Sequence, residues 1–222
     1  MNANEFVREL SNLQFDNTFN PYSDRCEVYD YADAPKRRRL LLTKILKAAS
    51  QIQVDAIWIG RDLGYRGGRR TGLALTDDVY FFEHAKRWGV EIDRPTKGQV
   101  VSERTAAVIW SILSQIKSTV FLWNVFPLHP YGEGDPFSNR THNAVEKAAG
   151  EELLSFLVQI LNPGKVVAIG NDAGDSAFRI LAQSDIIKVR HPSYGGQNIF
   201  LAQMRSLYGL DEVNHVGVPV LK

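Results

Sequence analysis

Three short apolar segments constrain the fold of this chain most strongly. They are "DAIWIG" (55–60), "STVFLWN" (118–124) and "GKVVAIG" (164–170). Each is rich in β-branched or aromatic residues, does not alternate with polar residues, and ends in a polar residue or a glycine. This pattern is typical of strands that are buried on both faces. A weaker segment, "DIIKVR" (185–190), is predicted to form a fourth strand.

Segments with helical periodicity lie between and after these strands. They cover residues 77–89, 102–117, 143–162 and 195–209. Strands that alternate with helices form a parallel sheet with helices on both of its faces. The sequence therefore predicts an α/β protein of three layers, α/β/α, around a central, mostly parallel four-stranded sheet.

The length and composition favour one domain over two. The chain has 222 residues, of which 44% are hydrophobic, and no segment rich in Pro, Gly or Ser divides it. Its start, "NEFVREL", is typical of an amphipathic helix. We therefore predict a single domain over 1–222, in which residues 1–50 form a helical extension that packs on the rest.

The charges are nearly balanced, with a formal net charge of +1. No overall positive field indicates nucleic-acid binding, so any contact with DNA must come from local clusters of basic residues. Two clusters exist, "PKRRR" (35–39) and the arginines of 61–70. For each of them, a solvated loop without a partner is the alternative.

Cysteine content and hydropathy limit the cofactors and the location. Cys26 is the only cysteine, so it cannot form an internal disulfide, and alone it cannot hold a zinc ion or an iron–sulfur cluster. The sequence contains no signal peptide at its start and no run of about 18 apolar residues. We expect a cytoplasmic monomer without metal, cofactor or membrane association.

Polar residues and glycines follow each predicted strand directly. They are Asp62, Asn124, the segment 170–172 and His191. In open parallel sheets the ligand site lies beyond the carboxyl ends of the strands. The sequence therefore predicts a site built from these residues.

The glycine-rich loop after the first strand does not match known phosphate-binding loops. Its glycines fit neither the dinucleotide fingerprint nor the Walker pattern. Asp62 also argues against bound phosphate, because the two negative charges would repel each other.

Asn124 and His191 each allow a functional and a structural interpretation. The Asn124 amide offers an acceptor and a donor side by side, which matches the N3–H and O4 groups of uracil or thymine. Alternatively, it bonds to its own loop backbone. His191 precedes Pro192 and Ser193, so a stiff turn can aim its ring at a pocket, whereas an isolated loop histidine is usually inert.

Taken together and in this order, the segments resemble the motifs of the uracil-DNA glycosylase superfamily. The uracil-specific branch has Gly-Gln-Asp-Pro-Tyr followed by Gly-Leu-Cys-Phe-Ser, and "GRDLGY" and "GLALT" occupy the same register here without a gap. "WNVFPLHP" resembles the second motif, and "HPSYGG" matches the His-Pro-Ser motif. The resemblance runs from about 52 to 210 and is greatest to a bacterial branch. The absence of four cysteines excludes the version that carries an iron–sulfur cluster.

The resemblance implies a monofunctional glycosylase of base excision repair, which hydrolyses the N-glycosidic bond of uracil or of a related deaminated or 5-modified base in DNA. The base would first be flipped out of the duplex. Asp62 would orient water and oppose the positive charge of the sugar, Asn124 would read the base edge, and His191 would donate to O2 of the departing base. The residues implied to bind the base are Gly60, Arg61, Gly64, Leu75 and Asn124. Those implied to contact DNA are Arg66, Arg69, Arg70, Ser193 and Tyr194.

Four departures from the family pattern bear on specificity. Leu75 stands where the family has an aromatic residue that stacks on the base. Gly64 replaces a tyrosine that blocks the thymine methyl, so we expect room for a 5-substituted base. Leu63 replaces a proline and is expected to relax the loop. Gly195 stands in the place of an apolar wedge, which leaves Tyr194 as the nearest candidate.

Two alternatives to the glycosylase follow from these observations. The first is a DNA- or base-binding module on the same fold, in which the departures have removed catalysis. The second is an α/β enzyme that acts on a free nucleotide, which the balanced charge permits, because open α/β sheets support unrelated chemistries.

Overall fold

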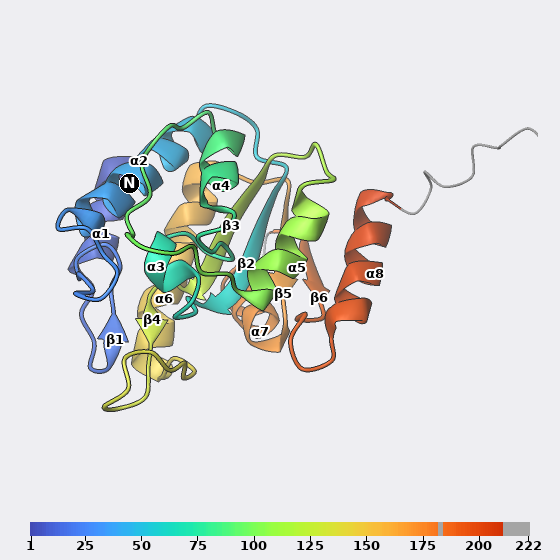
Figure 1. Cartoon of the computed structure of the whole chain (residues 1–222). Coiled ribbons are helices and arrows are strands. Elements are labelled where there is room, and N and C mark those ends of the chain that lie inside the picture. Colours follow the sequence, from blue (N-terminus) through green and yellow to red (C-terminus); the bar gives the residue numbers. More distant parts are fainter. Residues whose placement is uncertain (182–183, 211–222) are drawn as a thin grey trace, which may run out of the picture.

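The computed structural model describes residues 1–181 and 184–210. Its central sheet has four parallel strands in the order β3-β2-β5-β6 (Figure 1). The strands are β2 (Ala56–Asp62), β3 (Val120–Phe126), β5 (Lys165–Ile169) and β6 (Ile186–Val189). The predicted α/β fold and its four-stranded sheet are confirmed.

A second, two-stranded sheet pairs β1 (Thr18–Phe19) with β4 (His129–Pro130) in antiparallel orientation. This sheet was not predicted, because two residues are too few to show an alternating or continuous apolar pattern. It connects the N-terminal region to the loop that follows β3.

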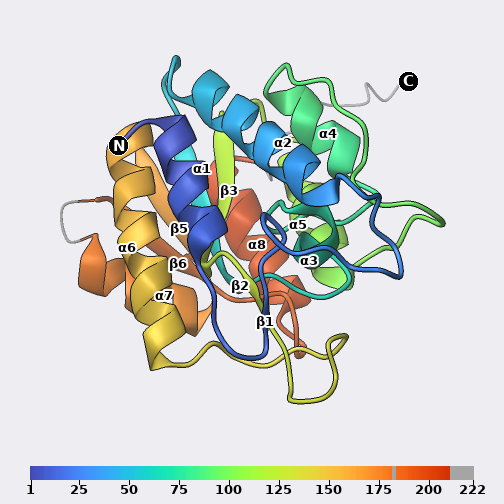
Figure 2. The same ribbon diagram turned by 90° about the vertical axis from the view of Figure 1, so that its left-hand side faces the viewer.

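Helices cover both faces of the central sheet. Against one face pack α1 (Ala3–Asn12), α2 (Ala34–Ala49), α4 (Phe81–Arg87), α6 (Ala144–Leu161) and α7 (Asn171–Ile180). Figure 2 shows α1, α2 and α6 in front of the sheet. Against the other face pack α5 (Arg104–Leu113) and α8 (Gln197–Tyr208). The one-turn helix α3 (Gly68–Thr71) lies in the loop after β2. The sequence did not predict α3 or α7. It predicted α2 only as part of the helical extension of residues 1–50.

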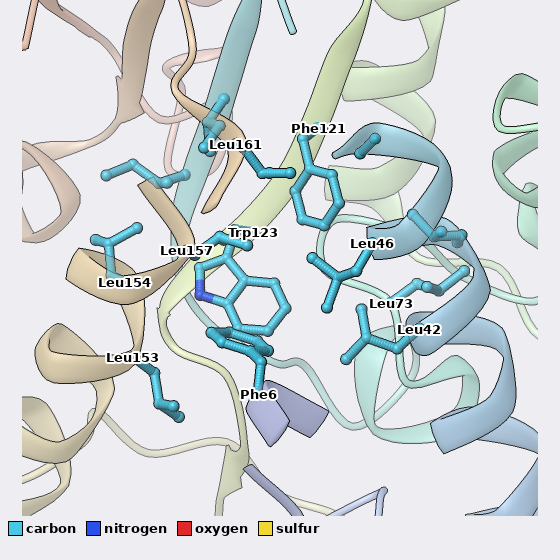
Figure 3. Close-up of a cluster of buried hydrophobic side chains, with 14 of the residues drawn as sticks. Phe6, Leu42, Leu46, Leu73, Phe121, Trp123, Leu153, Leu154, Leu157 and Leu161 are labelled. Atoms are coloured by element: carbon cyan, nitrogen blue, oxygen red, sulfur yellow. The ribbon is translucent and has the colours of Figure 1, made fainter. Parts of the chain in front are cut away.

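The core on the α1/α2/α6 face is built around Trp123 of β3. Its ring lies 5.5 Å from that of Phe6, measured between centroids, and Leu46 and Leu157 contribute to the same cluster (Figure 3). All four side chains are fully or almost fully buried. The helices of the first fifty residues thus contribute to the same core as β3 and α6.

The basic run at 35–39 lies in the first turns of α2. Arg38 is buried and forms an ion pair with Asp30, while Arg37 pairs with Asp33 at 2.8 Å. Arg39 donates to the carbonyl of Tyr22. These arginines therefore hold α2 against the preceding loop, and the solvated-loop alternative is wrong for them.

The direction of the chain brings several helix starts to one edge of the sheet. Each of α5, α6 and α7 leads into a parallel strand, so each runs back from the carboxyl edge to the amino edge. α8 begins after β6 at the same edge. In the described part of the chain, no helix has the length and apolar character needed to cross a membrane.

Candidate active site

Asn124 lies near the carboxyl end of β3, where its Cα pairs with that of Gly60 in β2. Its side chain is buried, and neither Nδ2 nor Oδ1 has a hydrogen-bond partner among the described residues. A buried amide without partners costs free energy, and such groups are uncommon in folded proteins. The alternative that Asn124 bonds to its own loop is therefore not what the structure shows. Both polar atoms of the amide are thus buried, and no described residue uses them.

Gly60 and Leu75 lie against this amide. A Cβ atom on Gly60 would lie 2.5 Å from Oδ1 of Asn124 and 3.0 Å from Cδ2 of Leu75, so only glycine fits. Leu75 has a left-handed φ of 53°, and its carbonyl accepts a hydrogen bond of 3.2 Å from Nε1 of Trp110. The leucine is thus held in an unfavourable backbone conformation beside Asn124.

Asp62 ends β2, and both of its carboxylate oxygens have partners. Nε of Arg61 donates to Oδ2 at 2.7 Å, and Nδ1 of His142 bonds to Oδ1. Arg61 also reaches Asp172 at the start of α7, with Nη1 3.2 Å from Oδ2. These contacts fix the direction of the carboxylate at the edge of the sheet. Arg61 was predicted to bind the base. In the structure its guanidinium group instead donates hydrogen bonds to Asp62 and Asp172.

His142 was not predicted as a site residue. It lies directly before Asn143, whose side chain caps α6 by accepting from the backbone N–H groups of Val145 and Glu146, at 2.9 and 3.0 Å. The helix start was predicted at 143, and a helix that begins at the carboxyl edge places the preceding residue there. That signal places His142 at the carboxyl edge, although it does not predict the contact with Asp62.

His191 follows β6 and packs against Gly170, where a Cβ would lie 3.1 Å from Cβ of His191. Its Nδ1 accepts a hydrogen bond of 3.1 Å from the backbone N–H of Ser193. Burial lowers the pKa of His191, and the charges of Arg61 and Arg190 lower it further. The ring is therefore neutral at neutral pH, and its one proton lies on Nε2, which can donate to a ligand.

Leu63 does not relax the loop after β2, and this prediction is wrong. Its backbone N–H donates to the carbonyl of Leu128 at 3.1 Å, a bond that proline cannot form. Its side chain is buried, and a Cβ on Gly68 would lie 2.4 Å from its Cδ2. The leucine therefore anchors the loop by a hydrogen bond and by packing.

The space expected beside Gly64 is occupied by Glu103, the residue that precedes α5. A Cβ on Gly64 would lie 2.7 Å from Oε1 of Glu103, and one on Gly67 would lie 2.0 Å from Oε2. Burial raises the pKa of Glu103 to about 7; Asp77 adds to this effect and Arg66 opposes it. Glu103 was not predicted, although it too precedes a helix that starts at this edge.

Of the three loop arginines predicted to contact DNA, only Arg66 is exposed. Arg69 is buried and donates to the hydroxyl of Tyr29 at 2.7 Å. Arg70 is buried and donates to Asp78 at 2.8 Å. The structure does not support a phosphate contact for Arg69 or Arg70, because their charges serve interactions inside the protein.

The turn after His191 carries the most exposed aromatic side chain of the site. Tyr194 is 99% exposed and has a left-handed φ of 52°, followed by Gly195 at 75°. Oγ of Ser193 lies 3.4 Å from Oγ1 of Thr105 in α5, which ties the turn to that helix. The tyrosine thus projects into solvent from a turn that is fixed at its base.

The structure thus brings the ends of β2, β3 and β6 to one edge, with Asp62, Asn124 and His191 at these ends. His129, also after β3, is fully buried and bonds to the carbonyl of Ser138 at 2.9 Å, so it has a structural role. Over residues 1–181 and 184–210, no three His, Cys, Asp or Glu side chains group in a way that could hold a metal ion.

Comparisons with known proteins bear on the family and the fold of the chain. The model of a family described as the uracil DNA glycosylase superfamily matches residues 41–205. No curated protein sequence matches the chain significantly. Among solved structures, the chain is similar to SMUG2 of Pedobacter heparinus, with a TM-score of 0.61 and 14% identity over 95% of this chain and 99% of that one. At this identity the likeness shows the fold, whereas the family match covers most of the chain. The chain belongs to the uracil DNA glycosylase superfamily.

Proposed function

We propose that this protein is a DNA glycosylase that hydrolyses the N-glycosidic bond of uracil, or of a related deaminated or 5-modified base, in base excision repair. The observation that carries the proposal is the buried Asn124 amide without a partner among the described residues. Its donor and acceptor complement the N3–H and O4 groups of uracil. A bound base of this kind would satisfy both atoms of the amide.

The base must leave the duplex before it can reach Asn124. The exposed ring of Tyr194, in the turn after His191, would stack in the space that the base vacates. Arg66 and the hydroxyl of Ser193 lie in loops at the same edge, where they would contact the phosphates of the strand. In this proposal the two loops hold the backbone while the base enters.

In the chemical step the bond between C1′ and the base nitrogen breaks, and its electron pair goes to the base. Negative charge develops on O2 of the base, to which Nε2–H of the neutral His191 would donate. One donor aimed at a developing anion contributes about 3 kcal/mol to such a step. Water adds to C1′ and its proton passes to the anionic base, so the products are an abasic sugar and the free, neutral base.

Asp62 would orient this water and oppose the positive charge that forms on the sugar. Its carboxylate is held by Arg61 and His142, so its direction is set before the substrate arrives. We regard His142 as a positioning residue, because it acts through Asp62. Asp62 and the neutral His191 would thus stabilise the two charges that develop in the reaction, on the sugar and on the base.

A second candidate function is a DNA-binding module without catalysis. The same geometry favours it, because both oxygens of Asp62 already have protein partners. A binder would also tolerate Leu75 in place of a stacking aromatic residue. The two candidates differ in how they respond to a change at Asp62.

The test is alkaline strand scission of labelled oligonucleotides that carry uracil, hypoxanthine, xanthine or thymine opposite each partner base. We expect the wild-type protein to cut one lesion, and Asp62→Asn and His191→Leu to lose this activity. Asp175→Asn, an exposed carboxylate of α7, is the matched control and should cut normally. If no substrate is cut but oligonucleotides still bind, the binding module replaces the glycosylase.

A further inference from the structure

A cavity of about 480 Å³ lies beside the proposed base site. The lining residues that matter here are Tyr65, Arg66, Glu103, Arg104, Thr105 and Asn139. None of Asp62, Asn124 and His191 lines it. The cavity is therefore separate from the groups proposed to act on the extruded base, and its volume is in the usual range for ligand pockets.

The walls of the cavity connect it to the three loops of the site. The backbone N–H of Tyr65 donates to Oδ1 of Asn139 at 3.0 Å, which joins the loop after β2 to the segment that leads to His142. Thr105 lies against Ser193 of the turn after His191. The cavity therefore lies where the loop after β2, the segment before α6 and the turn after His191 approach one another.

Glu103 lines this cavity, and its carboxyl group lies beside Gly64 and Gly67. Its backbone N–H donates to Oδ2 of Asp77 at 2.6 Å, which fixes its position. Gly64 and Gly67 leave room for its carboxyl group, yet none of the described residues donates a hydrogen bond to that group. Burial and Asp77 raise the pKa of this group to about 7, against the effect of Arg66, so it is an acceptor above that pH. A half-buried carboxylate without a donor is unfavourable, and a ligand that supplies one would bind there.

Two arginines at the cavity carry charges that the protein does not use. Arg66 and Arg104 are exposed, and neither forms an ion pair with another residue of the described ranges. Within the described ranges, the one side-chain hydrogen bond of Arg104 is long, with Nη2 3.5 Å from Oε1 of Gln197. Free guanidinium groups at a cavity mouth are suited to phosphate.

We propose that this cavity is a second nucleotide subsite, which holds the nucleotide that adjoins the extruded one. Its phosphate lies between Arg66 and Arg104, and Glu103 accepts a hydrogen bond from an exocyclic amino group of its base. A carboxylate that accepts from N4 is the usual way in which proteins recognise cytosine. The inference rests on the proposed function in that it requires DNA as the ligand, and it predicts that cytosine is preferred next to the target base.

The experiment compares 5-methylcytosine with thymine at each position that flanks the target base. These two bases differ only in the amino or carbonyl group at C4 and the proton on N3. Single-turnover excision and the Kd from fluorescence anisotropy are both measured at about pH 8, above the pKa of Glu103. At one of the two flanks we expect the wild-type protein to prefer 5-methylcytosine about tenfold, the effect of one hydrogen bond to a charged group.

Two kinds of variant test whether this base preference arises in the cavity. Glu103→Gln should bring the ratio between the two bases to within about twofold, because an amide can donate as well as accept. Glu152→Gln, an exposed glutamate of α6, is the matched control and should keep the full ratio. Arg66→Ala and Arg104→Ala should each reduce the slope of log Kd against log salt by about 1.

The outcomes separate this inference from the proposed function. Excision without any flank preference, or with a preference that Glu103→Gln retains, overturns the subsite alone. A preference in Kd without excision supports the subsite and overturns the glycosylase. If no oligonucleotide binds at low salt, both are wrong.

Discussion

The two faces of the central sheet differ in what their side chains do at the carboxyl edge. Trp123 and Asn124 are neighbours on β3 and point to opposite faces. Trp123 packs against Phe6 in the apolar core and leaves only its indole Nε1 without a partner, whereas both amide atoms of Asn124 lack one among the described residues. Both faces pack against apolar clusters, but at the carboxyl edge the face opposite Trp123 carries a polar group at a cost in stability. Substitutions on the two faces should differ accordingly in their effects.

The largest expected effect is on stability. Trp123→Ala should lower the free energy of unfolding by about 3–5 kcal/mol, because it leaves a cavity in the core. Asn124→Ala should leave it nearly unchanged, because the amide has no partner to lose within the described chain. Urea unfolding of both variants measures the difference. A comparable loss for Asn124→Ala would show that its amide stabilises the fold and that the division between the faces is wrong.

The next effect is on the chemical step. His191→Leu should slow single-turnover excision about 10²–10³-fold, the effect of removing one donor to a developing anion. The Kd for the same oligonucleotide should change much less, because the negative charge on O2 forms only in the transition state. Rapid-quench kinetics and anisotropy give the two numbers. Equal losses in rate and affinity would assign His191 a binding role instead.

A smaller effect is expected on base choice. Asn124→Asp replaces the amide donor with a second acceptor, which disfavours O4 of uracil and favours the amino group of cytosine. The change in relative rate should correspond to about 1–3 kcal/mol. Competition between uracil- and cytosine-containing oligonucleotides measures it. Excision of uracil at the wild-type rate would mean that Asn124 does not read the base.

The smallest effect concerns the pH dependence of stability. The pKa of Glu103 is raised from 4.5 to about 7 in the folded chain. Between these values the folded state holds a proton that the unfolded state has lost, so this group's contribution to stability falls as the pH rises through that window. Glu103→Gln removes the contribution, and the variant should lose less stability than the wild type between about pH 5 and pH 8.

Because solvent screens the partly exposed carboxyl group, we expect an effect of about 1 kcal/mol, which is a Tm difference on the order of 2–4 °C. Comparison with the variant is needed because the buried His84 and His129 have lowered pKa values and act in the opposite direction at acidic pH. Parallel pH profiles for the wild type and Glu103→Gln would show that Glu103 titrates normally in the folded chain.

The sequence predicted the sheet well because buried strands have a local signature. All four strands of the central sheet were found within two residues of their ends, and each leads to the edge at which the site was expected. It predicted the loop residues less well. Arg66 and Arg69 look alike in the sequence, but one side chain is exposed and the other lies under Phe19 and Phe137.

By itself, the sequence determined the strands, their parallel direction and the edge of the sheet that carries the polar groups. These features follow from hydrophobic periodicity and from the alternation of strands and helices along the chain. Only the tertiary structure decided which side chains meet there. His142 reaches Asp62 across 80 positions, and Glu103 fills the space beside Gly64. Such contacts depend on how separate helices pack on the sheet, and no local pattern along the chain encodes that packing.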